Sequence, residues 1–182
     1  FKQNVDNVID EDDDEKKKEM ILSSAKGLLF SKAITANTKK LTNSELDRAH
    51  LVKASKIYSS SKDFNAVRQY LDSKGMGDYD VDEGLSSDDA LVTKNPDGTI
   101  EVSWRGTNKT NISEWKTNAD ILAGQQTDNI KFKNARSLFD RVKVKYPNAK
   151  YHASGFSLGG ALASDIGNFH DVESTLFNPH LG

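Results

Sequence analysis

The sequence predicts an α/β fold in which helices flank a mostly parallel sheet. Apolar residues recur at helical spacing in five segments of the chain. In the second half, three short β-prone runs alternate with two of these helical segments. A strand–helix–strand order favours parallel pairing, because each helix then serves as the crossover connection between two strands.

Length and composition limit the classes of function. The 182 residues suffice for one domain with a sizeable core. The 25 Lys and Arg residues nearly balance 27 Asp and Glu residues, so the bulk charge gives no reason to expect a nucleic-acid partner. The absence of cysteine excludes disulfides and thiolate metal sites. No apolar run has the length of a transmembrane helix, and no signal-peptide pattern opens the sequence. No cellular compartment is indicated.

The two ends of the sequence lead us to expect a piece of a longer protein. The chain starts at Phe1 rather than Met, and Gly182 follows directly after an expected core strand. Residues 1–19 are rich in charge, with an acidic run at Asp10–Glu15 and three lysines after it. Such blocks are typical of flexible segments or interaction tails. The acidic run lacks the spacing and glycine of a calcium loop, so we expect no metal there. The folded part is expected over 20–182.

Three helices are expected before the first clear strand. They cover residues 20–33, about 44–58 and about 62–74. Thr42 with Glu45, or Ser44 with Asp47, would make a capping box at the start of the second helix. His50 lies within that helix, where we expect it to be solvated or hydrogen-bonded rather than catalytic. The three helices could together cover one face of the sheet.

The strand pattern begins with a hairpin. Two β-prone runs, 90–93 and 99–104, flank the turn sequence N-P-D-G. A helix is expected over about 131–146, and a last strand over 174–177. Ligands of parallel sheets lie beyond the carboxyl ends of the strands. Three loops should therefore meet at one edge: those that follow Trp104, Ser154 and Phe177.

The stretch K-Y-H-A-S-G-F-S-L-G-G-A-L joins a strand at 150–154 to a helix at about 158–168 through a very tight turn. Gly155 and Gly159 flank Ser157 in the spacing G-x-S-x-G, which is the pattern of a nucleophile elbow. The glycines are needed because the serine has a strained backbone and side chains on either flank would clash. The turn also aims the positive end of the helix at the reacting centre. The alternative is a Gly-Ser loop before a buried helix.

Three separate motifs together resemble the class 3 lipase family, the fungal-type lipases of the α/β-hydrolase fold. Residues 102–107, V-S-W-R-G-T, look like the strand that leads into that family's oxyanion loop. Residues 155–163, G-F-S-L-G-G-A-L-A, look like its elbow, and 175–182, T-L-F-N-P-H-L-G, are similar to the strand that follows. The resemblance covers roughly 45–182, in the right order and spacing. It implies an α/β-hydrolase-like domain that lacks its C-terminal portion.

The resemblance also implies roles for single residues. Ser157 would be the nucleophile, and the backbone N–H of Leu158 would bind the oxyanion. Thr107 would supply the second oxyanion donor through its backbone and hydroxyl. The loop 108–119 would occupy the lid position, with Trp115 as the tryptophan commonly found there. An ester or lipid substrate is implied, with no metal or organic cofactor.

No catalytic triad closes within the chain. In this fold the order is serine, aspartate, histidine. His170 lies 13 residues after Ser157, about 20 Å along a helix, and is too far to be the base. His180 stands where the family more often has arginine, and His152 precedes the turn within its strand. We therefore expect a C-terminal continuation or a second polypeptide to supply Asp and His. The alternative is a catalytically silent domain that serves as a structural or binding module of a larger assembly, such as a virus particle.

Overall fold

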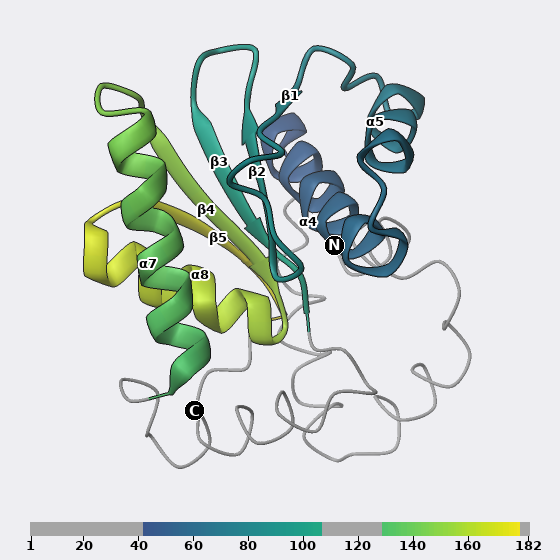
Figure 1. Ribbon diagram of the computed structural model, residues 1–182. Helices are drawn as coiled ribbons and strands as arrows, with labels where there is room; N and C mark the ends of the chain where they lie inside the picture. Colours follow the sequence, from purple (N-terminus) through teal and green to yellow (C-terminus); the bar gives the residue numbers. More distant parts are fainter. Residues whose placement is uncertain (1–41, 107–128, 179–182) are drawn as a thin grey trace, which may run out of the picture.

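The computed structural model describes residues 42–106 and 129–178, which form three layers (Figure 1). A five-stranded sheet is the middle layer, with α4 and α5 on one face and α7 and α8 on the other. The helices are α4 (Asn43–Ser61), α5 (Phe64–Ser73), α7 (Ile130–Lys145) and α8 (Leu158–His170). The strands are β1 (Asp80–Val81), β2 (Ala90–Lys94), β3 (Ile100–Trp104), β4 (Tyr151–Phe156) and β5 (Glu173–Phe177).

The strands lie in the order β1-β2-β3-β4-β5. β1 pairs with β2, and β2 with β3, in antiparallel fashion, whereas β3–β4 and β4–β5 are parallel. The predicted hairpin and the predicted parallel strands are both confirmed. The sheet is nevertheless mixed rather than mostly parallel, because its first three strands form an antiparallel meander. The sequence analysis missed β1, since a strand of two residues shows no periodicity.

Strand β3 is buried along its whole length, because helices cover both faces of the sheet. Ile100, Val102 and Trp104 belong to the core on the α7 and α8 side. Glu101 and Ser103, which alternate with them, point to the opposite face, where α4 lies. The helices contribute further buried residues to the first core: Phe132, Leu138, Phe139, Val142, Leu162 and Ile166.

A second core lies between the sheet and the first two described helices. Leu51 and Ala54 of α4 pack with Val67 and Leu71 of α5, and with Leu91 of β2. This arrangement confirms that the helices before the first strand cover one face of the sheet, for the two of them that the structure describes.

The start of α4 decides between the two capping boxes that the sequence allows. The backbone N–H of Glu45 donates to the Thr42 hydroxyl at 3.3 Å, and the N–H of Thr42 donates to the Glu45 carboxylate at 2.8 Å. Thr42 is thus the N-cap, and both orphan donors of the helix end are satisfied reciprocally.

The four helices predicted within the described residues are confirmed, with ends that differ by a few positions. The charged segment 1–19 and the helix predicted over 20–33 lie outside the described residues. In the part of the chain that the structure describes, no helix combines the length and apolar character needed to cross a membrane.

Candidate active site

Ser157 occupies the turn between β4 and α8 in a backbone conformation that is rare for a residue with a side chain. Its φ is 54° and its ψ is −119°. These are the angles of the first central position in a type II′ turn, where glycine dominates. A serine held there costs of order 1–3 kcal/mol and persists only because the surroundings impose it. The tight strand–turn–helix predicted from G-x-S-x-G is therefore present in the structure.

The two flanking glycines are sites where backbone meets backbone. A Cβ atom on Gly155 would lie 2.0 Å from the carbonyl oxygen of Gly159. A Cβ atom on Gly159 would lie 2.3 Å from the carbonyl oxygen of Arg105 and 2.4 Å from that of Trp104. No side chain can be accommodated at such distances. The glycines thus let α8 start directly against β4 and against the end of β3.

Hydrogen bonds fix both sides of the turn. The N–H of Ser157 donates to the carbonyl of Phe177 at 3.0 Å, and the N–H of Ala161 donates to the carbonyl of Ser157 at 3.2 Å. The side chain of Ser157 does not cap the helix. Leu158 is the first residue of α8, and the first N–H groups of a helix have no acceptor within it. The turn therefore places a hydroxyl beside the first backbone N–H groups of α8.

The carboxyl ends of three parallel strands meet at this turn. Phe177 at the end of β5 holds the N–H of Ser157. A Cβ atom on Gly106, two residues after β3, would lie 3.6 Å from the Cβ of Ser157 and 3.1 Å from the carbonyl of Phe156. The expected convergence of the three strand ends is confirmed. Three residues given roles or weighed above lie outside the described residues: Thr107, Trp115 and His180.

Arg105 ties the end of β3 to the loop before β2 and to the start of α7. Its Nε donates to the carbonyl of Asp88 at 2.6 Å, and its Nη1 to the carbonyl of Gly106 at 2.8 Å. Its Nη2 donates to the Asp89 carboxylate at 2.8 Å. Nζ of Lys131 lies 2.9 Å from both oxygens of the same carboxylate. The sequence analysis missed this cluster, because nothing local to Arg105 indicates that Asp89 and Lys131 meet it.

None of the described histidines hydrogen-bonds Ser157. His50 Nδ1 lies 2.9 Å from the Tyr70 hydroxyl, which confirms that it is hydrogen-bonded within the fold. His170 is at the far end of α8, beyond hydrogen-bonding reach of the turn, as the spacing predicted. None of the described histidines is therefore placed to accept a proton from Ser157.

His152 belongs to a buried polar row on the α4 face of the sheet. Its Nδ1 lies 3.0 Å from a carboxylate oxygen of Glu101, and its Nε2 lies 3.2 Å from the hydroxyl of Thr175. Arg48 of α4 reaches the other oxygen of Glu101 at 3.4 Å. Glu101 is fully buried, and a buried carboxylate requires such partners. These side-chain hydrogen bonds connect β3, β4 and β5. A glutamate within an apolar strand was the sequence signal for it.

His170 is a buried histidine whose environment disfavours the protonated ring. Its side chain is 6% exposed, and its ring lies 4.8 Å from that of Phe139. Burial lowers the pKa of His170, while the negative charge of Asp140 acts in the other direction. Below the ordinary histidine pKa of about 6.5, His170 is protonated in the unfolded chain but still neutral in the folded chain. The free energy of unfolding therefore falls as the pH decreases.

We expect the His170→Phe variant to lose this part of the pH dependence, because phenylalanine fills the same space without a titrating group. Urea unfolding at neutral pH and at mildly acidic pH measures the difference. The Asp140→Asn variant is the matched comparison, since it removes the carboxylate that favours the protonated ring. It should lose more stability in acid than the wild type. Equal pH dependence in all three proteins would contradict the assignment.

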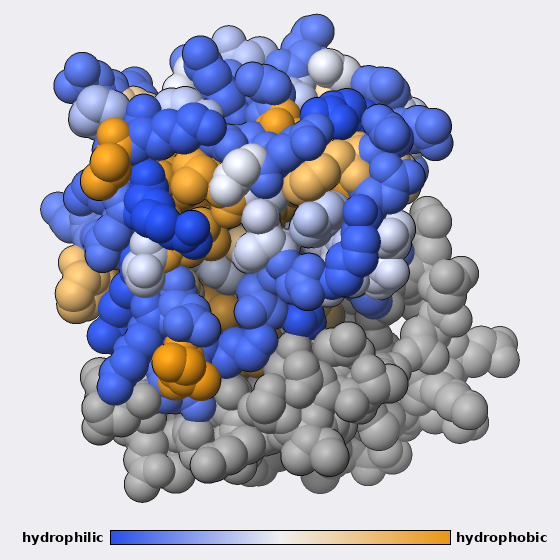
Figure 2. Space-filling model, in the orientation of Figure 1, coloured by the Kyte–Doolittle hydropathy of each residue, from blue (hydrophilic) through white to orange (hydrophobic). Residues whose placement is uncertain are grey.

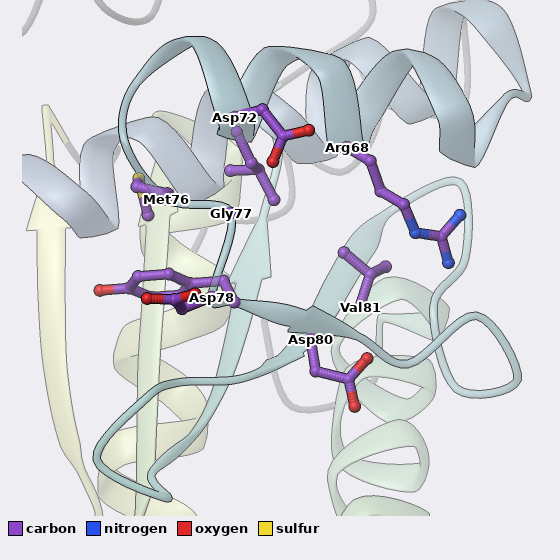
Figure 3. Close-up of a pocket in the computed structure, with 9 residues that line it drawn as sticks. Arg68, Asp72, Met76, Gly77, Asp78, Asp80 and Val81 are labelled. Atoms are coloured by element: carbon purple, nitrogen blue, oxygen red, sulfur yellow. The ribbon is translucent and has the colours of Figure 1, made fainter.

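The hollows on the described surface include the following two. The larger, of about 340 Å³, is shown in Figure 3 between α5 and β1, and none of its lining residues belongs to the turn around Ser157. The carboxylates of Asp72, Asp78 and Asp80 point in different directions there and do not converge as metal ligands would (Figure 3). Among the described residues, no group of His, Asp and Glu could hold a metal ion. The second hollow, of about 280 Å³, lies beside the end of β3 and is lined in part by Trp104 and Leu162.

Hydrophilic residues cover most of the face shown in Figure 2, and hydrophobic residues form a few separate groups. Three large apolar side chains of the described residues are more than half exposed: Ile130, Val144 and Phe169. Single exposed apolar residues are ordinary on protein surfaces. The described residues of this face thus form no broad continuous apolar area.

Comparison with known proteins gives one remote likeness. No family model matches the sequence, and no curated protein matches it. Among solved structures, the chain is similar to a fungal lipase determined as an inhibitor complex in a study of interfacial activation. The TM-score is 0.39 and the identity 16%, over 71% of this chain and 58% of the lipase. The chain thus spans less than two thirds of that protein.

Proposed function

We propose that this chain is the N-terminal portion of an α/β-hydrolase-like domain, over 20–182, and that it hydrolyses carboxylic esters as a serine hydrolase of lipase or esterase type. The strained backbone of Ser157 is the observation that supports this function. A structural loop has no need of a serine at φ 54° and ψ −119°, where glycine would fit without strain. A nucleophile does need it, because the sharp turn lifts the hydroxyl out of the sheet edge.

The proposed reaction runs through an acyl-enzyme. A base takes the proton of the Ser157 hydroxyl while its oxygen attacks the ester carbonyl, and the carbonyl electrons move to the oxygen. That oxyanion is stabilised by the N–H of Leu158 and by Thr107. Collapse of the intermediate expels the alcohol, which takes up the proton from the base. Water then attacks the acyl-enzyme in the same manner, releasing the carboxylic acid and restoring Ser157.

The base and its orienting acid are the parts that the described residues do not supply. We propose that a histidine and an aspartate complete the site from a C-terminal continuation or from a second polypeptide. The positive end of α8 at Leu158 favours developing negative charge at the turn, whichever chain provides the base. No metal or organic cofactor has a role in this reaction.

A second candidate function is consistent with the same described residues. Among the described residues, Ser157 has no hydrogen-bonded histidine, because His50 and His152 are bonded elsewhere within the fold. A catalytically silent lipase-like domain, used as a structural or binding module of a larger assembly, would have the same geometry. The two candidates differ in whether Ser157 reacts.

Hydrolysis of a series of p-nitrophenyl esters, from acetate to palmitate, tests the proposed function. We expect saturable hydrolysis with a preference for one range of chain lengths. Ser60→Ala is the matched control for Ser157→Ala. Ser60 is an exposed serine of α4, so its variant should keep the wild-type rate. Background hydrolysis with every ester, by a protein shown to be folded by circular dichroism, would favour the silent module.

A further inference from the structure

We propose that Glu101 is a positioning residue for the hydrolysis, and that it acts through His152 and Thr175 on the place of Ser157. The inference rests on the proposed function. It gives the buried polar row on the α4 face of the sheet a part in the reaction, although the row is not hydrogen-bonded to Ser157 within the described structure.

The first argument is that the row runs from α4 across three strands. Arg48 Nε lies 3.4 Å from one carboxylate oxygen of Glu101, and His152 Nδ1 lies 3.0 Å from the other. An ionised carboxylate only accepts hydrogen bonds, so Nδ1 carries the proton and donates to Glu101. In the neutral ring Nε2 is then the acceptor, and the Thr175 hydroxyl donates to it at 3.2 Å. Glu101 thereby fixes the tautomer that the bond from Thr175 requires.

The second argument is that the row is shielded from water. The side chain of Glu101 is fully buried, that of His152 is 4% exposed, and that of Arg48 is 22% exposed. When one member of such a row is lost, a buried polar atom is left without a partner, which is costly. The row therefore holds His152 and the Thr175 hydroxyl in one arrangement.

The third argument is that β5 connects the row to the turn. The N–H of Ser157 donates to the carbonyl of Phe177 at 3.0 Å, and Phe177 comes two residues after Thr175. In the parallel ladder Thr175 is paired with Ser154, and Phe177 with Phe156. A displacement of Thr175 along β4 would therefore move the carbonyl that holds the backbone of Ser157. A strained serine depends on such contacts, because its surroundings impose its conformation.

The fourth argument is that β5 has backbone support on one side. It stands at the end of the strand order, so β4 is its one partner among the described strands. On the α4 face, Ala49 and Val52 form an apolar cluster with Phe177. Arg48, which precedes Ala49 in the same helix, reaches Glu101. One stretch of α4 thus supports both the row and the end of β5.

Thr175→Val in the complete protein tests the proposal, with hydrolysis of a short p-nitrophenyl ester as the readout. Valine fills the space of threonine but cannot donate to His152. We expect kcat, counted per site that a fluorophosphonate titrates, to fall by about 10-fold, because a displaced nucleophile is poorly aligned with the ester. The KM should change by less than about twofold, since no contact with the bound ester is removed. Thr175→Ser restores the hydroxyl and should return kcat to within about twofold of the wild-type value.

Glu101→Gln tests whether the carboxylate acts through the hydroxyl. An amide can donate as well as accept, so it no longer fixes the tautomer of His152. We expect kcat to fall, with little change in KM. The double variant with Thr175→Val should lose no more than Thr175→Val alone, because both substitutions interrupt the same connection. Losses that multiply in the double variant would contradict it.

Thr99→Val is the matched control, because the Thr99 hydroxyl is also hydrogen-bonded, to Asp97 at 3.1 Å, but at the hairpin turn between β2 and β3. It should leave kcat and KM unchanged. A wild-type kcat in Thr175→Val, or an equal fall in Thr175→Ser, would overturn the positioning role and leave the proposed function standing. If Thr175→Val fails to fold by circular dichroism, Arg48→Gln decides by the same split between kcat and KM. A wild type that neither hydrolyses esters nor reacts with the fluorophosphonate would overturn both proposals.

Discussion

Gly159→Ala should destabilise the protein by more than about 3 kcal/mol, or prevent its folding, because the new methyl group has no room. It would lie 2.3 Å from one backbone carbonyl oxygen of the β3 end and 2.4 Å from another. Backbone atoms cannot rotate away as a flexible side chain can. The only relief is to move α8 off the sheet, which would also open the turn at Ser157. Urea unfolding followed by circular dichroism measures the loss.

Gly84→Ala is the matched control for this substitution. Its added Cβ would lie 3.6 Å from a carboxylate oxygen of Asp82, which is an ordinary van der Waals contact. Its free energy of unfolding should stay within about 0.5 kcal/mol of the wild type. Gly155→Ala should behave like Gly159→Ala, with a contact of 2.0 Å to backbone. A stable, folded Gly159→Ala protein would show that α8 does not start against β3 as described.

Substitutions at Ser157 should separate stability from activity. Ser157→Ala removes the nucleophile, and we expect ester hydrolysis to fall by on the order of 10⁴- to 10⁶-fold. Ser157→Gly should be equally inactive but more stable than the wild type by about 1 kcal/mol, because glycine adopts the angles of this turn without strain. Steady-state hydrolysis and urea unfolding, run on the same preparations, measure the two effects.

A control substitution at another serine shows whether these effects are specific to Ser157. Ser154→Ala is a suitable control, because Ser154 is buried three residues earlier and its hydroxyl lies 3.0 Å from that of Ser103. It should lower stability and leave the catalytic rate of the folded protein largely intact. If Ser157→Gly were less stable than the wild type, the serine would be contributing to the fold, which argues for a structural role of the hydroxyl.

The features predicted from the sequence are those that depend on residues close together in the chain. Helical periodicity located the helices on both sides of the sheet, and N-P-D-G between two β-prone runs located the hairpin. The tight turn at Ser157 followed from the two glycines, since their spacing leaves few other backbone paths. The capping box at Thr42 was one of two local alternatives, and only the chain geometry decided between them.

The features that escaped prediction depend on contacts between distant segments. Strand β1 forms because its backbone pairs with the edge of β2. Its own two residues carry no strand pattern. The cluster of Arg105, Asp89 and Lys131 joins residues 42 positions apart in sequence. The row of Glu101, His152 and Thr175 spans three strands, and a single sequence shows only that a glutamate interrupts an apolar run. Such polar clusters become visible only once strand order and register are known.

Reaction with a fluorophosphonate, followed by intact mass and peptide mapping, tests the central claim most directly. Such a reagent forms a covalent adduct with an activated serine and releases fluoride. We predict a single adduct, located on Ser157 and absent from Ser157→Ala, in a preparation that includes whatever chain supplies the base. Several partial adducts on other serines, or none on a protein that is folded and complete, would contradict the account and leave the domain as a binding module.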